Sequence, residues 1–95
     1  MLWVAELVPG MESIYTKKHA EIWPSMVELL GQSGVSNYSI HIEGSMVVGC
    51  YESENPQQTQ EIQNRSEVIT QWNEHVNECF LHPPKALHNL VMFLP

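Results

Sequence analysis

The chain has 95 residues, enough for one domain with a modest core, and its 43% apolar content is typical of a folded protein. A formal net charge of −7, with only four Lys and Arg residues, disfavours nucleic acid and anionic membrane surfaces as partners. Two cysteines make no disulfide framework, and neither a signal peptide nor a membrane-spanning apolar run stands out. We therefore expect a cytoplasmic protein with a single domain over residues 1–95.

The first third of the chain predicts a strand followed by a broken helix. Residues 2–8 are almost continuously apolar, as in a buried strand. Apolar side chains then recur at helical spacing over residues 11–22. Because a proline inside a helix removes a backbone donor and clashes with the preceding turn, we expect a break at Pro24 and a second helical segment over residues 25–30.

The middle of the chain predicts a β-hairpin. Residues 35–42 alternate between apolar and polar side chains, and residues 46–51 form a second strand-like run. The Glu43-Gly44-Ser45 segment between them is typical of a turn. The two strands are therefore expected to pair antiparallel.

The last third predicts a long helix and a final strand. Apolar residues recur at three- and four-residue steps over residues 59–80, and Ser66 offers a cap at which this helix can break. A Pro-Pro pair cannot continue a helix, so we expect a loop over residues 81–84. Residues 87–94 then predict the last strand.

The predicted order of elements matches the ferredoxin-like α+β arrangement, βαββαβ with an antiparallel sheet. Both helical parts of such a fold lie on one face of the sheet, so the other face needs a cover. In a chain of 95 residues, the expected cover is a second copy of the same chain. This argument predicts a homodimer.

Tyr15 and His19 are the first candidate site residues. They are four residues apart, so on a helix they lie one turn apart on the same face. The pair offers a phenol and an imidazole, and the imidazole can donate or accept a proton near pH 7. From the spacing alone, the simpler explanation is a pair that packs its rings at the helix edge.

Four blocks of the sequence resemble the L-rhamnose mutarotase family, in the order in which that family has them. They are Tyr-x3-His-x2-Ile-Trp-Pro at residues 15–24, Asn-Tyr-Ser-Ile within residues 34–42, the tryptophan-containing helix at residues 66–72, and Phe-Leu-Pro within residues 92–95. The resemblance implies a dimeric α+β barrel, in which two ferredoxin-like sheets face each other. It also implies an aldose mutarotase, which interconverts the α and β anomers of L-rhamnose or a related sugar.

The resemblance implies roles for five residues. It makes His19 the acid/base that transfers protons, and Tyr15 a contact to the monosaccharide. It likewise implies that Tyr38 and Trp72 bind the sugar. Asn73 stands where the family has a second tryptophan, so we expect it to bind the sugar as well, and this exchange puts the physiological sugar in question. One imidazole suffices for such proton transfers, so no metal or other cofactor is expected.

Two of these residues have structural explanations as well. Tyr38 alternates in phase with Ile40 and Ile42, on the face that meets the helices, so either the sugar pocket is partly apolar or a bulge redirects Tyr38. Trp72 lies on the apolar stripe of its helix, where a core role is the simpler explanation.

Other functions remain open for this fold. One is a non-catalytic dimeric module that binds a small ligand, and another is a cofactor-free oxygenase, because one fold hosts many functions. A metal site is not expected: Cys79, His82 and His88 form the only suggestive cluster, and no second pair completes four ligands.

Overall fold

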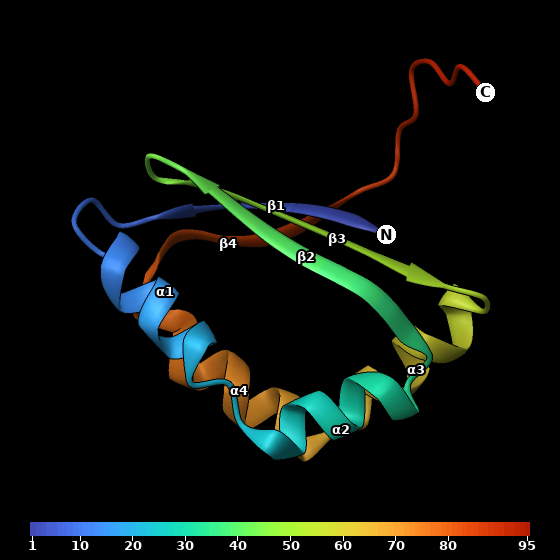
Figure 1. Ribbon diagram of the computed structural model, residues 1–95, viewed down its shortest axis with the longest axis horizontal. Coiled ribbons are helices and arrows are strands. Elements are labelled where there is room, and N and C mark those ends of the chain that lie inside the picture. Colours follow the sequence, from blue (N-terminus) through green and yellow to red (C-terminus); the bar gives the residue numbers. More distant parts are fainter.

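Four strands form one antiparallel sheet in the order β2-β3-β1-β4, and four helices lie on one face of it (Figure 1). The computed structural model describes all residues, 1–95. The strands are β1 (Leu2–Leu7), β2 (Val35–Glu43), β3 (Met46–Ser53) and β4 (Phe80–Leu87). The helices are α1 (Glu12–Ala20), α2 (Pro24–Gln32), α3 (Pro56–Asn64) and α4 (Glu67–Asn77). The predicted ferredoxin-like α+β fold is confirmed, with each predicted helix present as a pair of helices.

Local sequence signals account for the two helix breaks. Trp23 is extended, with φ −64° and ψ 136°, and Pro24 begins α2 at a position where its missing N–H costs nothing. The Ser66 side chain accepts a hydrogen bond from the backbone N–H of Ile69 and so caps α4. Asn55 caps α3 in the same way, which is why α3 begins at Pro56 rather than at the predicted residue 59.

The prediction of the last strand was wrong. β4 covers Phe80–Leu87 and contains the Pro-Pro pair, whereas a loop over residues 81–84 and a strand over residues 87–94 were expected. β4 is an edge strand that pairs only with β1, so residues without an N–H fit in it where no ladder bond is needed. Residues 88–95 leave the sheet without regular structure, on the side opposite the helices (Figure 1).

The register of the strands sorts their side chains between two faces. Paired residues share a face, so one row on the helix side reads Ile40, Gly49, Trp3 and Ala86. The neighbouring row on that side contains Ile42, Val47 and Ala5. Buried side chains gather on this face and on the helices that cover it.

None of the four helices has the length and apolar character needed to cross a bilayer.

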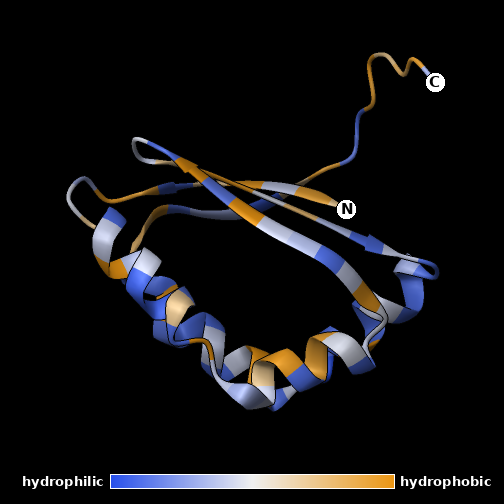
Figure 2. Cartoon of the chain, viewed as in Figure 1, coloured by the Kyte–Doolittle hydropathy of each residue, from blue (hydrophilic) through white to orange (hydrophobic).

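The opposite face of the sheet has no covering layer in the single chain. Leu2 pairs with Leu87 on this face, and both are exposed, as is Met46. Figure 2 shows a further apolar run in the C-terminal segment, residues 90–94, whose side chains are at least 69% exposed.

Candidate active site

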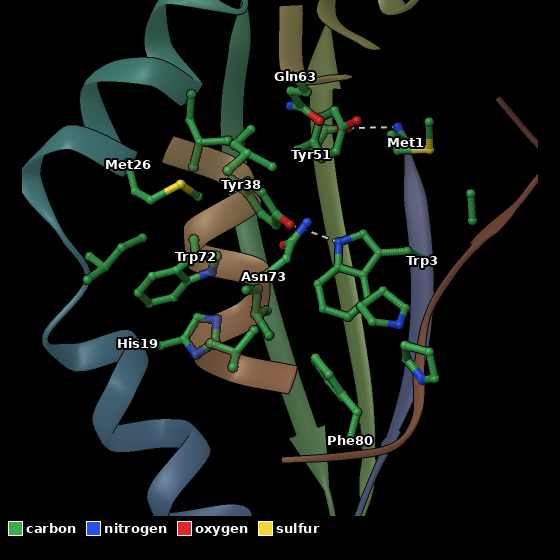
Figure 3. A pocket seen from close by; sticks show the side chains of 18 of the residues that line it. Met1, Trp3, His19, Met26, Tyr38, Tyr51, Gln63, Trp72, Asn73 and Phe80 are labelled. Carbon is green, nitrogen blue, oxygen red and sulfur yellow. Dashed lines mark hydrogen bonds between the residues drawn. The ribbon is translucent and has the colours of Figure 1, made fainter. Parts of the chain in front are cut away.

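A pocket of about 650 Å³ opens between the sheet and the helix layer (Figure 3). Its wall includes all five residues singled out from the sequence: Tyr15, His19, Tyr38, Trp72 and Asn73. Most of the lining side chains are apolar, and a few polar groups project among them. This mixture is typical of a site that binds a small organic molecule.

His19 lies near the end of α1, with its imidazole in the pocket wall. Its Nδ1 atom is 2.9 Å from the backbone carbonyl oxygen of Tyr15. A carbonyl oxygen only accepts hydrogen bonds, so Nδ1 carries the ring proton and Nε2 keeps a free lone pair. Burial lowers the pKa of His19 below its ordinary value, and the hydrogen bond to Tyr15 opposes this shift without cancelling it. The neutral imidazole is therefore ready to accept a proton through Nε2.

Tyr15 belongs both to the core and to the pocket. It is buried, and its ring centroid lies 4.2 Å from that of His19 and 5.6 Å from that of Phe80. The predicted ring packing is therefore present, and it does not exclude a role at the pocket. Burial raises the pKa of Tyr15, so its hydroxyl keeps its proton and can act as a hydrogen-bond donor.

Tyr38 is positioned by an irregularity in β2. The pairing shifts between Ser36 and Ser39, so Asn37 and Tyr38 together lie opposite Tyr51. Asn37 has φ 50°, a left-handed conformation that asparagine tolerates better than most residues. Tyr38 thus stays on the helix side with Ile40, and both line the pocket. Of the two alternatives left open by the sequence, the partly apolar pocket is the one present: β2 contains a bulge, but the bulge leaves Tyr38 on the face of Ile40 and does not redirect it.

Trp72 also belongs both to the core and to the wall of the pocket. It is only 6% exposed and packs edge-on against Trp23, with ring centroids 5.1 Å apart. Its ring also lies edge-on to His19 at 5.3 Å, inside the same pocket. The core role expected from the apolar stripe is therefore real, and part of the indole still reaches the pocket.

Asn73 is part of a group of amide side chains on the helical wall of the pocket. The group comprises Gln60, Gln63, Asn73 and Asn77. Gln60 donates to Asn64, whereas the side chains of Gln63, Asn73 and Asn77 make no hydrogen bond within the chain. Each free amide offers donors and an acceptor, as the hydroxyl groups of a sugar require.

Sequence reasoning missed two aromatic residues of the sheet, Trp3 and Tyr51. Trp3 donates a hydrogen bond from Nε1 to the Tyr38 hydroxyl at 2.8 Å, and the rings of Tyr38 and Tyr51 lie 5.1 Å apart (Figure 3). Pairing the predicted hairpin outward from its turn would have placed Tyr51 beside Tyr38, whereas β1 is apolar on both faces and gives no such signal for Trp3.

The suggested metal cluster is not assembled. Cys79 is fully buried, whereas His82 is exposed and lies 3.8 Å from Glu6 on the helix-free face. No group of three His, Cys, Asp or Glu side chains could hold a metal ion together.

Comparison with known proteins places this chain in a family. The family model described as L-rhamnose mutarotase matches residues 1–91. An L-rhamnose mutarotase from Rhizobium leguminosarum bv. trifolii is 60% identical over 38 residues, which is 40% of this chain and 36% of that relative. The chain thus spans little more than a third of the length of that relative, 36%.

A longer match is found with an L-rhamnose mutarotase from Bacteroides thetaiotaomicron. It is 35% identical over 72 residues, covering 74% of this chain and 68% of the relative. Among solved structures, the L-rhamnose mutarotase from Formosa agariphila shares the fold, with a TM-score of 0.78 at 18% identity over 98% of this chain and 96% of that one. The family model and the longer match together establish that this chain belongs to the L-rhamnose mutarotase family.

Proposed function

We propose that this protein is an aldose mutarotase, an isomerase that interconverts the α and β anomers of L-rhamnose or a related sugar. The observation that carries the proposal is the tautomer of the His19 imidazole. Its Nδ1 proton is held by the Tyr15 carbonyl oxygen, which leaves Nε2 as a free base in a pocket wide enough for a monosaccharide.

The reaction requires only proton transfers. Nε2 of His19 takes the proton from the anomeric hydroxyl, the bond between the anomeric carbon and the ring oxygen breaks, and the ring oxygen receives a proton. Both oxygens are bonded to the same carbon, so one imidazole reaches both of them. The open-chain aldehyde then rotates, and the same steps in reverse close the ring on the other face of the carbonyl.

The remaining site residues would hold the sugar. Tyr15 and Tyr38 keep their hydroxyl protons because burial raises the pKa of each, so both can donate hydrogen bonds to sugar oxygens. The ring of Trp72 offers an apolar surface for the C–H groups of a pyranose. Asn73 adds an amide where the family has a second tryptophan, which favours a hydroxyl group at that place in the pocket.

The test is magnetisation-transfer NMR between the α and β anomer signals of a sugar panel, with and without the protein. His19→Ala should lose about 10²–10⁴-fold of the acceleration, the usual contribution of a general acid or base, while the melting temperature stays nearly unchanged. His88→Ala, at an exposed histidine of the terminal segment, is the matched control.

Three outcomes would oppose this proposal. A His19→Ala protein that unfolds would assign His19 to the core, and one that folds and exchanges anomers at the parent rate would remove it from the mechanism. Sugar binding without acceleration by the parent protein would instead favour the non-catalytic binding module.

A homodimer is part of the proposal. The helix-free face exposes Leu2, Leu87 and Met46, and the apolar run of residues 90–94 leaves the sheet on the same side (Figure 1). A second copy would remove both from water, since an exposed apolar area of this kind marks an interaction surface. Light scattering should give the dimer mass, and a monomer mass at micromolar concentration with a concentration-independent melt would contradict it.

The proposed partners are a monosaccharide and a second copy of this chain, and the proposed location is the cytoplasm. The net charge of −7 argues against nucleic acid and anionic membranes as partners. Cys50 and Cys79 are free thiols, which supports a reducing compartment.

A further inference from the structure

Trp3 occupies a position in the pocket wall that depends on a glycine. The strands are ordered β2-β3-β1, so β3 separates Trp3 on β1 from Tyr38 on β2. Gly49 is the β3 residue opposite Trp3, and a Cβ atom there would lie 2.0 Å from Cε2 of the indole. The indole therefore lies across β3 at the one place where no side chain stands in its path.

This crossing brings a donor to the Tyr38 hydroxyl. Nε1 of Trp3 donates to the Tyr38 oxygen at 2.8 Å, and an indole nitrogen cannot accept in return (Figure 3). With one lone pair engaged, the hydroxyl is held in place, and its own proton points to another acceptor. No group of the chain accepts that proton, and Tyr38 lines the pocket, so the acceptor must come from the pocket.

We propose that Trp3 is a positioning residue of the sugar site: its indole N–H fixes the Tyr38 hydroxyl as a donor to an oxygen of the bound sugar. This inference rests on the proposed mutarotase function. Trp3 acts through Tyr38 rather than on the reacting atoms. Without it, the hydroxyl is free to rotate and to act as donor or acceptor, so the selection of an acceptor oxygen is lost.

A double-mutant cycle tests this coupling. Trp3→Phe keeps an aromatic ring over Gly49 and removes only the N–H donor, and Tyr38→Phe removes the hydroxyl that it orients. Trp3→Phe should lower kcat/KM for anomer exchange about 2- to 10-fold, mainly through KM, as expected for one neutral hydrogen bond. If Trp3 acts through Tyr38, the double variant should lose no more than Tyr38→Phe alone. The proposal would be overturned if the double variant lost kcat/KM by the product of the two single losses. It would also be overturned if Trp3→Phe had the kinetics of the parent protein.

A second readout follows the ionisation of Tyr38 by ultraviolet absorption and needs no catalysis. Burial raises the pKa of Tyr38, and the Trp3 hydrogen bond opposes that rise because it stabilises the phenolate. Trp3→Phe should therefore raise the pKa of Tyr38 further. Tyr38→Phe, which has no phenol at this position, shows which part of the absorbance change belongs to Tyr38. Trp23→Phe removes an indole outside the pocket and is the matched control for this titration.

The two readouts separate this inference from the proposed function. If the parent protein does not accelerate anomer exchange, the mutarotase proposal fails, and the titration still reports whether Trp3 controls the hydroxyl. An unchanged Tyr38 pKa in folded Trp3→Phe would contradict the positioning role even where exchange is fast.

Discussion

The sheet and the helix layer are joined by different kinds of contact at the two ends of the molecule. Buried apolar side chains join them at one end, which we call the apolar end: Ala5, Leu7, Tyr15, Val47 and Cys79. At the other end, the hydrogen-bonded end, the Thr59 hydroxyl donates to the carbonyl oxygen of Ser33 at 2.5 Å and lies 2.6 Å from the Ser53 hydroxyl. Thr59 links three elements in this way, since Ser33 follows α2 and Ser53 ends β3.

The pocket lies between these two ends. Its wall runs from Tyr15 and Phe80, beside the apolar end, to Leu30 and Gln60, beside the hydrogen-bonded end. A cavity cannot stabilise its own walls, because the lining atoms lack contacts on one side. The two ends therefore hold the layers apart at a fixed spacing, and the geometry of the pocket depends on residues that do not line it, such as Leu7 and Thr59.

The largest effect on stability is expected from the apolar end. Leu7 has no exposed surface, so Leu7→Ala leaves a cavity and should lower the free energy of unfolding by about 2–5 kcal/mol in urea titrations. Ile42 lies on the same face of the sheet but is 38% exposed, so Ile42→Ala should cost about 1 kcal/mol or less. Equal losses at the two positions would show that the full burial of Leu7 does not account for the stability of the apolar end.

A smaller loss is expected at the hydrogen-bonded end. Thr59→Val keeps the shape of the side chain and removes its hydroxyl, which leaves the Ser33 carbonyl and the Ser53 hydroxyl without that partner. The expected cost is about 1–3 kcal/mol in the same titrations. Thr70→Val removes an exposed hydroxyl that bonds the Ser66 carbonyl at 3.1 Å, and it should be nearly neutral. An unchanged free energy of unfolding in Thr59→Val would show that the hydrogen-bonded end does not help to hold the two layers at their spacing.

The sequence predicted the apolar end better than the hydrogen-bonded end for a physical reason. Alternation and helical periodicity report which side chains face a core, so β1, the hairpin and the apolar face of α4 were placed correctly. The face of α1 was placed less well, since Ile14 of its predicted apolar stripe is 42% exposed and Tyr15 is the buried residue. Contacts between Thr59, Ser33 and Ser53 join residues far apart in the chain, and no local pattern reports them. The tolerance of β4 for two prolines likewise depends on its place at the sheet edge, which only the strand order reveals.

The candidate site was predictable only in part. The spacing of Tyr15 and His19 put both on one helix face, and the family resemblance added Tyr38, Trp72 and Asn73. Trp3 was hidden because β1 is apolar on both faces, so nothing in its alternation singles out the tryptophan.

Asn73 lies in the wall of the pocket, between the two ends, so changing it tests the pocket itself. Asn73→Trp replaces a free amide by a large apolar ring, so it should shift preference toward L-rhamnose over L-mannose, which carries a hydroxymethyl group. The expected change is about 1–3 kcal/mol, the usual worth of one apolar group in a pocket. The measurement is the ratio of exchange rates for the two sugars, parent against variant. An unchanged ratio in a folded variant would place Asn73 outside the sugar-binding surface.

The smallest expected effect concerns pH, and it follows from the position of His19 near the apolar end. An unperturbed histidine with a pKa of 6.5 is half protonated at that pH and would then have lost half of its activity as a base. Burial lowers the pKa of His19, so more than half of the plateau exchange rate should remain at pH 6.5. The decline should follow only at lower pH, and a half-maximal rate at or above 6.5 would contradict it.

The lowered pKa of His19 also determines whether the stability of the fold rises or falls as the pH drops. The pKa of His19 is lower in the folded state than in the unfolded chain, so below pH 6.5 the unfolded chain binds the proton more readily. Stability should therefore fall as the pH drops from 6.5 toward the folded pKa and then become independent of this group. An NMR titration of the His19 Cε1–H signal, assigned by its absence in His19→Ala, measures the folded pKa directly. Thermal melts of the parent protein and of His19→Ala should differ in their pH dependence over this range. The same pH dependence in both would show that another group is responsible.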